Sequence, residues 1–176
     1  MTAETAPHYF SLTHEAVRGY NTNAKMSPPL RTAADMTAIQ EGLADDTLDC
    51  IATDHAPHSS LEKEVEFDRA ANGIIGLETA VGLSLELVHP GVLTLTQLVT
   101  KLSVNPARIL RVPGGRLQVG DPADITVLAL KRPWTVDVAR FKSKSRNCPF
   151  EGWQLRGRAV MTIVGGEIKW QGESGN

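Results

Sequence analysis

Apolar residues recur at helical spacing in the first third of the chain. Three of them lie three or four residues apart: Met36, Ile39 and Leu43. This spacing predicts a helix that ends near Ala44. Thr32 and Asp35, three residues apart at its start, are typical of a capping pair, in which each side chain accepts a hydrogen bond from the other residue's backbone N–H.

A short apolar segment, Leu48–Thr53, follows this helix and is flanked by acidic residues. Its length and composition are typical of a strand buried on both faces. Because a helix followed by a buried strand is α/β order, we predict an α/β fold. The chain opens on an extended segment, Thr2–Thr5, with no cap before it, so we expect it to begin inside a larger fold. From Pro7 to Pro29, turn-forming residues predict a loop with at most a short helix near residues 15–18.

The middle of the chain changes from polar to helical character. Ser59–Gly76 is polar, charged and interrupted by glycine, which predicts a long exposed loop. Helices are predicted over Leu77–Val88 and Thr96–Leu102. Asn105 followed by Pro106 predicts the N-cap and first position of a third helix.

The apolar period changes to two beyond Gly114. Three segments fit strands: Asp124–Leu130, Arg158–Val164 and residues 167–170. Gly165-Gly166 between the last two predicts a hairpin turn. We therefore divide the chain into an α/β part, residues 1–112, and a small β region, residues 113–176, whose end, Glu173–Asn176, we expect to be frayed.

Composition narrows the function classes. Of 176 residues, 41% are hydrophobic and 22% charged, which is typical of a globular protein. The 18 basic and 20 acidic residues give a net charge of −2 without a basic stripe, which argues against nucleic acid as a partner. No apolar run approaches the roughly 20 residues that span a bilayer. With no secretion signal, we expect a cytoplasmic protein in which Cys50 and Cys148 stay reduced.

The strongest chemical signal is Ala52-Thr53-Asp54-His55-Ala56-Pro57-His58, directly after the predicted buried strand. In barrel enzymes this end of a strand carries the catalytic groups. A carboxylate there could bind a metal ion, accept a proton from attacking water and deliver it to a leaving group. From the spacing alone, an Asp that caps a loop is the more frequent explanation.

The whole string resembles the strand-eight motif of dihydroorotases in the amidohydrolase superfamily. Further segments resemble the same family in the same order: Thr2–Phe10, Lys25–Arg31, Asn72–Thr79, Ser103–Arg108, Gly120–Asp124 and Asn147–Phe150, in which Cys148 stands where the family usually has Thr. The resemblance therefore covers essentially the whole chain.

The resemblance implies the last strands of a (β/α)8 metal-dependent hydrolase barrel, plus a small β region from a composite β-sandwich. It also implies zinc-dependent, reversible hydrolysis of the cyclic amide of dihydroorotate to carbamoyl aspartate, a step of pyrimidine synthesis. The nearest alternatives are an allantoinase or a hydantoinase. A metal-free structural partner of a transcarbamoylase, such as aspartate transcarbamoylase, is the alternative from another class.

Site roles follow from the same resemblance. Asp54 takes the role of metal ligand and general acid/base. His58 becomes a hydrogen-bond donor to the substrate, and the backbone of Asn72 and Gly73 holds its ring. Ser27 stands where many members have an Asn that contacts the substrate carboxylate, and a hydroxyl offers one donor where an amide offers two.

The remaining polar candidates are expected to be structural. We expect Arg31 to form a surface ion pair rather than to bind a carboxylate. Among the histidines, His8 is expected in the pocket or core, and His55 to point away from the metals. His14 and His89 are expected in surface loops.

The chain has too few ligands for the binuclear zinc site that the resemblance implies. Such a site needs a His-x-His pair, a bridging acid or lysine and two further histidines, and no His-x-His occurs here. A full barrel also takes roughly 250 residues. We therefore expect a fragment that alone neither retains zinc nor hydrolyses dihydroorotate, and whose partner is the missing part of the barrel. Exposed strand edges favour a homo-oligomer.

Overall fold

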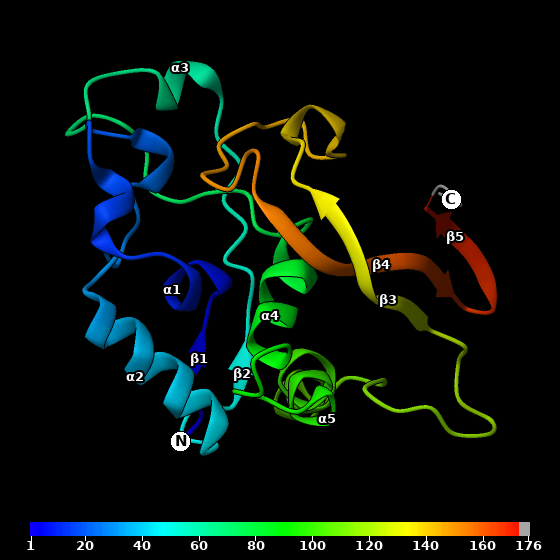
Figure 1. Cartoon of the computed structure of the whole chain (residues 1–176). Helices are drawn as coiled ribbons and strands as arrows, with labels where there is room; N and C mark the ends of the chain where they lie inside the picture. Colours follow the sequence, from blue (N-terminus) through cyan, green and yellow to red (C-terminus); the bar gives the residue numbers. More distant parts are fainter. Residues whose placement is uncertain (173–176) are drawn as a thin grey trace.

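Two short parallel strands form the centre of the N-terminal part. The computed structural model describes residues 1–172, so the expected fraying of Glu173–Asn176 lies outside the described residues. Strands β1 (Glu4–Thr5) and β2 (Cys50–Ile51) pair in parallel, and helices lie between them in the sequence (Figure 1). This is the strand, helix, strand order of α/β proteins, in agreement with the predicted α/β class.

The segment after β1 is more helical than predicted. Instead of a loop, it contains α1 (Pro7–Ser11) and the 3-10 turns η1 (His14–Val17) and η2 (Thr22–Ala24). Pro7 lies in the first turn of α1, where its missing N–H costs no hydrogen bond. Only η1 corresponds to the short helix expected near residues 15–18.

Helix α2 (Ala33–Ala44) confirms the predicted capping pair. The Thr32 hydroxyl accepts a hydrogen bond from the Asp35 N–H, and the Asp35 carboxylate accepts one from the Thr32 N–H at 3.0 Å. The strand expected after it is shorter than predicted, because only β2 pairs with a neighbour. Both β2 residues are buried, as a central strand requires.

Residues 59–76 are not the long exposed loop that their polarity predicted. They include α3 (Ser60–Lys63), and four side chains of the segment are buried: Lys63, Ala70, Ile74 and Ile75. The prediction of an exposed loop from polarity was wrong because Lys63 lies in the interior, where its side-chain nitrogen is hydrogen-bonded to backbone carbonyls.

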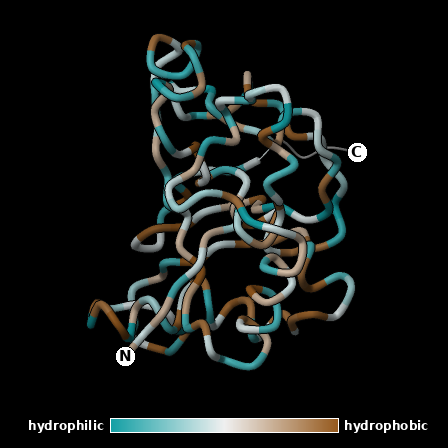
Figure 2. Tube along the Cα trace, turned by 90° about the vertical axis from the view of Figure 1, so that its left-hand side faces the viewer, coloured by the Kyte–Doolittle hydropathy of each residue, from teal (hydrophilic) through white to brown (hydrophobic). Residues whose placement is uncertain are grey.

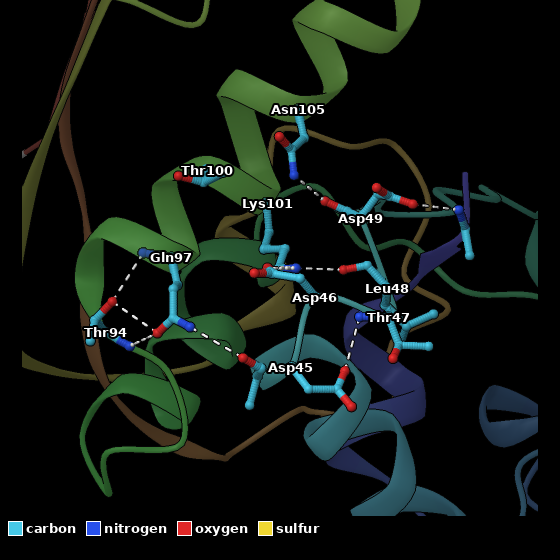
Figure 3. A network of polar contacts seen from close by, with 12 residues as sticks. Asp45, Asp46, Thr47, Leu48, Asp49, Thr94, Gln97, Thr100, Lys101 and Asn105 are labelled. Atoms are coloured by element: carbon cyan, nitrogen blue, oxygen red, sulfur yellow. Dashed lines mark hydrogen bonds and ion pairs between the residues drawn. The ribbon is translucent and has the colours of Figure 1, made fainter. Parts of the chain in front are cut away.

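The next helices are α4 (Ala80–Val88), α5 (Leu95–Val99) and α6 (Asn105–Leu110), the last two joined by a π-helical turn, η3 (Thr100–Val104). Asn105 is not an N-cap, because its backbone is helical (φ −64°, ψ −46°) and the helix continues through it. The start lies at Thr94, which forms a capping box with Gln97. The Asn105 side chain instead donates to the Asp49 carbonyl at 2.8 Å (Figure 3).

The C-terminal part is an antiparallel sheet in the order β3-β4-β5, with β3 (Ile125–Thr135), β4 (Gln154–Val164) and β5 (Glu167–Gln171). The turn between β4 and β5 is Gly165-Gly166 with φ of 58° and 83°, which confirms the predicted hairpin. The 3-10 turn η4 (Val138–Arg140) follows β3. The sheet packs beside α4 (Figure 1), where a Cβ on Gly82 would lie 2.9 Å from the Trp134 ring.

Both predicted thiols are free and buried. Burial raises the pKa of Cys148 to about 11, so its thiol stays protonated at neutral pH. Hydrophobic stretches are short and alternate with hydrophilic ones along the trace (Figure 2). Within residues 1–172, no helix is long and apolar enough to cross a membrane.

Candidate functional site

The carboxyl ends of β1 and β2 open into one pocket. Its volume is about 670 Å³. The walls come from the residues after each strand, from α1, from the Pro28-Pro29 turn and from α2, and include Thr5, Ala6, Tyr9, Pro28, Ala52 and Asp54. Parallel strands place their carboxyl ends at the same edge, which is where ligand sites form in α/β folds.

Asp54 lies on the wall of this pocket, three residues beyond β2. Its side chain is exposed, and its backbone adopts the left-handed region with φ of 47°. Non-glycine residues rarely adopt this region, and such strain is concentrated at functional sites. No hydrogen bond to its carboxylate is seen among residues 1–172, which leaves both oxygens available to a ligand.

The Asp54 charge acts on two neighbours from α1. Burial, followed by the Asp54 carboxylate, raises the pKa of Tyr9. Burial lowers the pKa of His8 to about 4, although the Asp54 charge opposes this change. His8 is therefore a neutral buried side chain at pH 7, which confirms the expectation of a pocket or core residue.

His55 does not line the pocket that contains Asp54. Its Nδ1 accepts a hydrogen bond from the Gly76 N–H at 3.1 Å, and it lines a different cavity, between α4 and the C-terminal sheet. His14 lies on the surface, with its Nε2 3.2 Å from a Glu15 carboxylate oxygen. His89 is not in an exposed loop, because it caps α4, is half-buried, and its Nε2 donates to the Arg156 carbonyl at 3.0 Å.

His58 belongs to the same loop as Asp54, but both of its ring nitrogens face protein groups. Nε2 donates to the Asn72 carbonyl at 2.9 Å, and Nδ1 lies 3.6 Å from a Glu62 carboxylate oxygen. Its predicted donation to substrate therefore needs release of the Asn72 carbonyl. In the present geometry His58 joins two loops.

Asn72 and Gly73 lie beside the Asp54 loop, since the Ala56 N–H donates to the Ile74 carbonyl next to them. Their contacts differ from the predicted role, since the Gly73 N–H donates to the Lys25 carbonyl at 2.8 Å. A side chain at position 73 would lie 2.7 Å from Ala56 Cβ, and φ there is 98°, so glycine permits the close approach of the loops. Within the described chain, the Asn72 N–H and side chain keep their hydrogen-bonding capacity for a ligand.

Ser27 is exposed and precedes a cis peptide bond to Pro28. Pro28 lines the Asp54 pocket, and the Tyr9 hydroxyl donates to its carbonyl at 2.8 Å. Pro28 and Pro29 therefore line the pocket, and the exposed Ser27 directly precedes them. Arg31, 67% exposed, lies 3.8 Å from Asp35, the surface ion pair that we expected.

Two lysines that the sequence analysis overlooked hold the loop between α3 and Gly73. Lys25 Nζ donates to the carbonyls of Asp68 and Ala70, at 2.9 and 2.6 Å. Lys63 Nζ donates to those of Ala71 and Gly73, at 2.8 and 3.1 Å. The sequence carries no signal for this arrangement, because the acceptors are backbone groups.

Asp54 could provide one ligand to a metal ion. Within residues 1–172, no three His, Cys, Asp or Glu side chains lie together in a way that could hold one. A structural or catalytic zinc ion takes three or four protein ligands. The exposed, unpartnered carboxylate fits one position of such a site, and the other ligands would come from elsewhere.

The sequence of the chain was compared with those of known protein families and proteins. The sequence profile of the amidohydrolase family matches residues 7–169. The chain is 59% identical over 171 residues to a dihydroorotase of Geobacter metallireducens, and 58% identical over 171 residues to one of Syntrophus aciditrophicus. Each match covers 97% of this chain and 40% of the relative, so the chain spans about two fifths of their length.

Solved structures agree. The L-hydantoinase of Arthrobacter aurescens superposes with a TM-score of 0.92 at 31% identity, covering 98% of this chain and 40% of that one. The dihydropyrimidinase of Brevibacillus agri gives 0.89 at 26% identity, covering 97% and 39%. Both are similar in fold over almost the whole of the present chain.

Proposed function

Because the chain belongs to the amidohydrolase family, we propose that it is part of a dihydroorotase and supplies the general acid/base of that enzyme. The supporting observation is the exposed Asp54 carboxylate at the shared carboxyl end of two parallel strands, in a chain 59% identical to a dihydroorotase. The hydantoinase alternative is less well supported, since identity to the L-hydantoinase is 31%.

The proposed reaction is hydrolysis of the cyclic amide of dihydroorotate. Water attacks the ring carbonyl carbon, the C–N bond breaks, and the leaving nitrogen receives a proton to give carbamoyl aspartate. Asp54 takes the proton from the attacking water and delivers it to that nitrogen. Bound zinc would polarise the carbonyl and lower the pKa of the water.

The remaining groups at this edge orient the substrate. We propose that the Asn72 backbone faces the ring and that the Ser27 hydroxyl binds the substrate carboxylate directly or through water. Tyr9 supports the Ser27-Pro28 turn through its hydrogen bond to the Pro28 carbonyl. His58 donates to substrate only if its bond to the Asn72 carbonyl opens, and otherwise fixes that loop.

The proposed whole is a zinc-dependent (β/α)8 barrel, to which this chain contributes β1, β2 and the helices around them, with β3–β5 in a composite β-sandwich. The test supplies the rest by joining the chain to the part of a relative, such as the Geobacter enzyme, that it does not match. We expect the chain alone to be inactive with substoichiometric zinc by elemental analysis, and the joined protein to hydrolyse dihydroorotate.

In the joined protein, Asp54→Asn removes the proton acceptor and should lower kcat by about 10²- to 10⁴-fold. Glu41→Gln, the same carboxylate-to-amide change on an exposed residue of α2 outside the pocket lining, is the matched control and should leave kcat unchanged. Equal kcat for Asp54→Asn and the parent would refute the assignment. Faster turnover of hydantoin or allantoin than of dihydroorotate would favour the other cyclic amidohydrolases.

A non-catalytic scaffold makes the opposite prediction. The joined protein would then show no hydrolysis of any cyclic amide and would co-elute with aspartate transcarbamoylase in size-exclusion chromatography. We favour the enzyme, because the exposed Asp54 lines the pocket and no hydrogen bond to its carboxylate is seen among residues 1–172.

A further inference from the structure

A side chain far away in the sequence lies between the two loops of the site. Asn147 belongs to the segment between β3 and β4, some 90 residues from the Asp54 loop, and is 3% exposed. The loops it meets already run side by side: the Ala56 N–H donates to the Ile74 carbonyl at 2.8 Å, and His55 and Ile74 form a parallel bridge.

The Asn147 amide uses its hydrogen-bonding groups on both loops at once. Nδ2 donates to the Ala56 carbonyl at 2.8 Å and to the Gly73 carbonyl at 3.2 Å. Oδ1 accepts from the His58 N–H at 3.3 Å. The Asn147 backbone carbonyl also accepts from the Ile75 N–H at 3.1 Å.

This arrangement specifies the residue type. One atom must donate to two carbonyls while the other accepts from an N–H, and an amide is the short side chain with both capacities. A carboxylate at position 147 would direct a negatively charged oxygen at the Ala56 and Gly73 carbonyl oxygens. A serine hydroxyl has one donor, so it could serve only one of the two.

We propose that Asn147 is a positioning residue that sets the distance between the loop carrying Asp54 and His58 and the loop carrying Asn72 and Gly73. This inference rests on the proposed function, because it assigns Asn147 an effect on dihydroorotate binding. The amide acts through the Ala56 and Gly73 carbonyls and the His58 N–H and does not itself touch substrate. Lys63 donates to the same Gly73 carbonyl, so the junction has two supports of different origin.

Buried asparagines also stabilise folds generally, so the experiment needs a matched control. Asn105 is 8% exposed, its Nδ2 donates to the Asp49 carbonyl at 2.8 Å, and its Oδ1 accepts from Arg108 at 3.1 Å. It lies beside the loop that precedes β2, at the opposite end of that strand from Asp54. Asn105→Asp is thus the same amide-to-carboxylate change at a comparably buried residue that does not contact the Asp54 and Gly73 loops.

The first readout is kinetic, in the joined protein. We expect Asn147→Asp to raise KM for dihydroorotate roughly tenfold or more, Asn147→Ser to give a smaller rise, and Asn105→Asp to lower thermal stability with KM unchanged. A KM of Asn147→Ser equal to that of the parent, or an equal rise in Asn105→Asp, would overturn the proposal. Asn147→Ser keeps the test decisive if Asn147→Asp does not fold.

The second readout needs no activity, so it separates this inference from the proposed function. Backbone hydrogen exchange, followed by mass spectrometry, should be faster in the Asn147→Ser variant than in the parent over two segments, residues 55–58 and residues 72–76. The Asn105→Asp variant should show the exchange of the parent in both segments. Faster exchange confined to the segment around residue 147 would refute the coupling. Loss of protection in both loops in a joined protein without dihydroorotase activity would support Asn147 as a positioning residue and refute the assigned substrate.

Discussion

Lys63 carries an amine into the interior of the site. It is 3% exposed, and its Nζ donates to the Ala71 and Gly73 carbonyls. Burial, followed by the positive charge of Lys25, lowers the pKa of Lys63 to about 8. A neutral amine still has two N–H donors, so deprotonation keeps both hydrogen bonds and removes the cost of a buried charge.

This pKa predicts a pH-dependent contribution to stability. Between pH 8 and 10.5 the unfolded chain holds the Lys63 proton and the folded chain releases it, so raising the pH favours folding. The contribution reaches at most about 3 kcal/mol, from about 1.36 kcal/mol per pH unit. We expect urea unfolding of the chain from pH 7.5 to 10.5 to show this gain relative to Lys63→Met.

The effect of Lys63 is the difference in the free energy of unfolding between the parent chain and Lys63→Met. The raised pKa values of Cys148 and Tyr9 lower the stability of the folded chain as the pH rises over the same pH range, because these groups ionise first in the unfolded chain. These groups are common to both proteins and cancel in the difference. Parallel stability curves for parent and Lys63→Met would contradict the prediction.

At the scale of elements, the helix that runs from α5 through η3 to α6 holds the loop before β2. Three side chains spaced four residues apart donate to backbone carbonyls. Lys101 donates to Leu48 and Asn105 to Asp49 in that loop (Figure 3), and Gln97 donates to Ala44 at the end of α2. Lys101, 1% exposed, also pairs with Asp46 at 2.6 Å. The helix thus holds the amino end of β2, the end opposite to Asp54.

Lys101→Met should destabilise the chain. It leaves the half-buried Leu48 carbonyl without this donor, which costs about 1–3 kcal/mol. The Asp46 side chain is 75% exposed and stays hydrated, so the loss should not reach that of a fully buried ion pair. Urea unfolding checks this against Lys131→Met, an exposed lysine of β3. Equal midpoints for both variants would exclude the anchoring role.

These elements also show what the sequence could predict. The capping pair of Thr32 and Asp35 and the Gly165-Gly166 hairpin were confirmed because their partners are local. Asn105 was misassigned because its local pattern fits a cap, whereas a carbonyl 56 residues away takes its amide. The role of Asn147 could not be predicted for the same reason, since its acceptors are 74 and 91 residues away.

At the scale of the whole molecule, the C-terminal sheet ends in two strand edges that are unpaired within residues 1–172. Strands β3 and β5 are the outer members of the order β3-β4-β5. Ile168 of β5 is 57% exposed. Open edges with apolar side chains promote pairing between chains.

We therefore expect the isolated chain to self-associate. Sedimentation velocity should show an average mass that rises with concentration. Ile168→Lys, which places a charge on the edge strand, should shift the distribution toward the monomer. Thr37→Lys, which adds the same charge on the exposed face of α2, should have no effect. A single monomeric boundary for the parent at every concentration would contradict this expectation.

The hydrogen bonds of Asn147 have a consequence for the order of events during synthesis. A nascent polypeptide that has emerged as far as Gly76 already contains Asp54, His58 and Gly73, but their two loops still lack the amide that joins them. Translation must proceed through β3 before that amide exists. A ribosome stalled before residue 147 would therefore display the loops of the site with the Ala56–Ile74 hydrogen bond but without the amide that completes their junction.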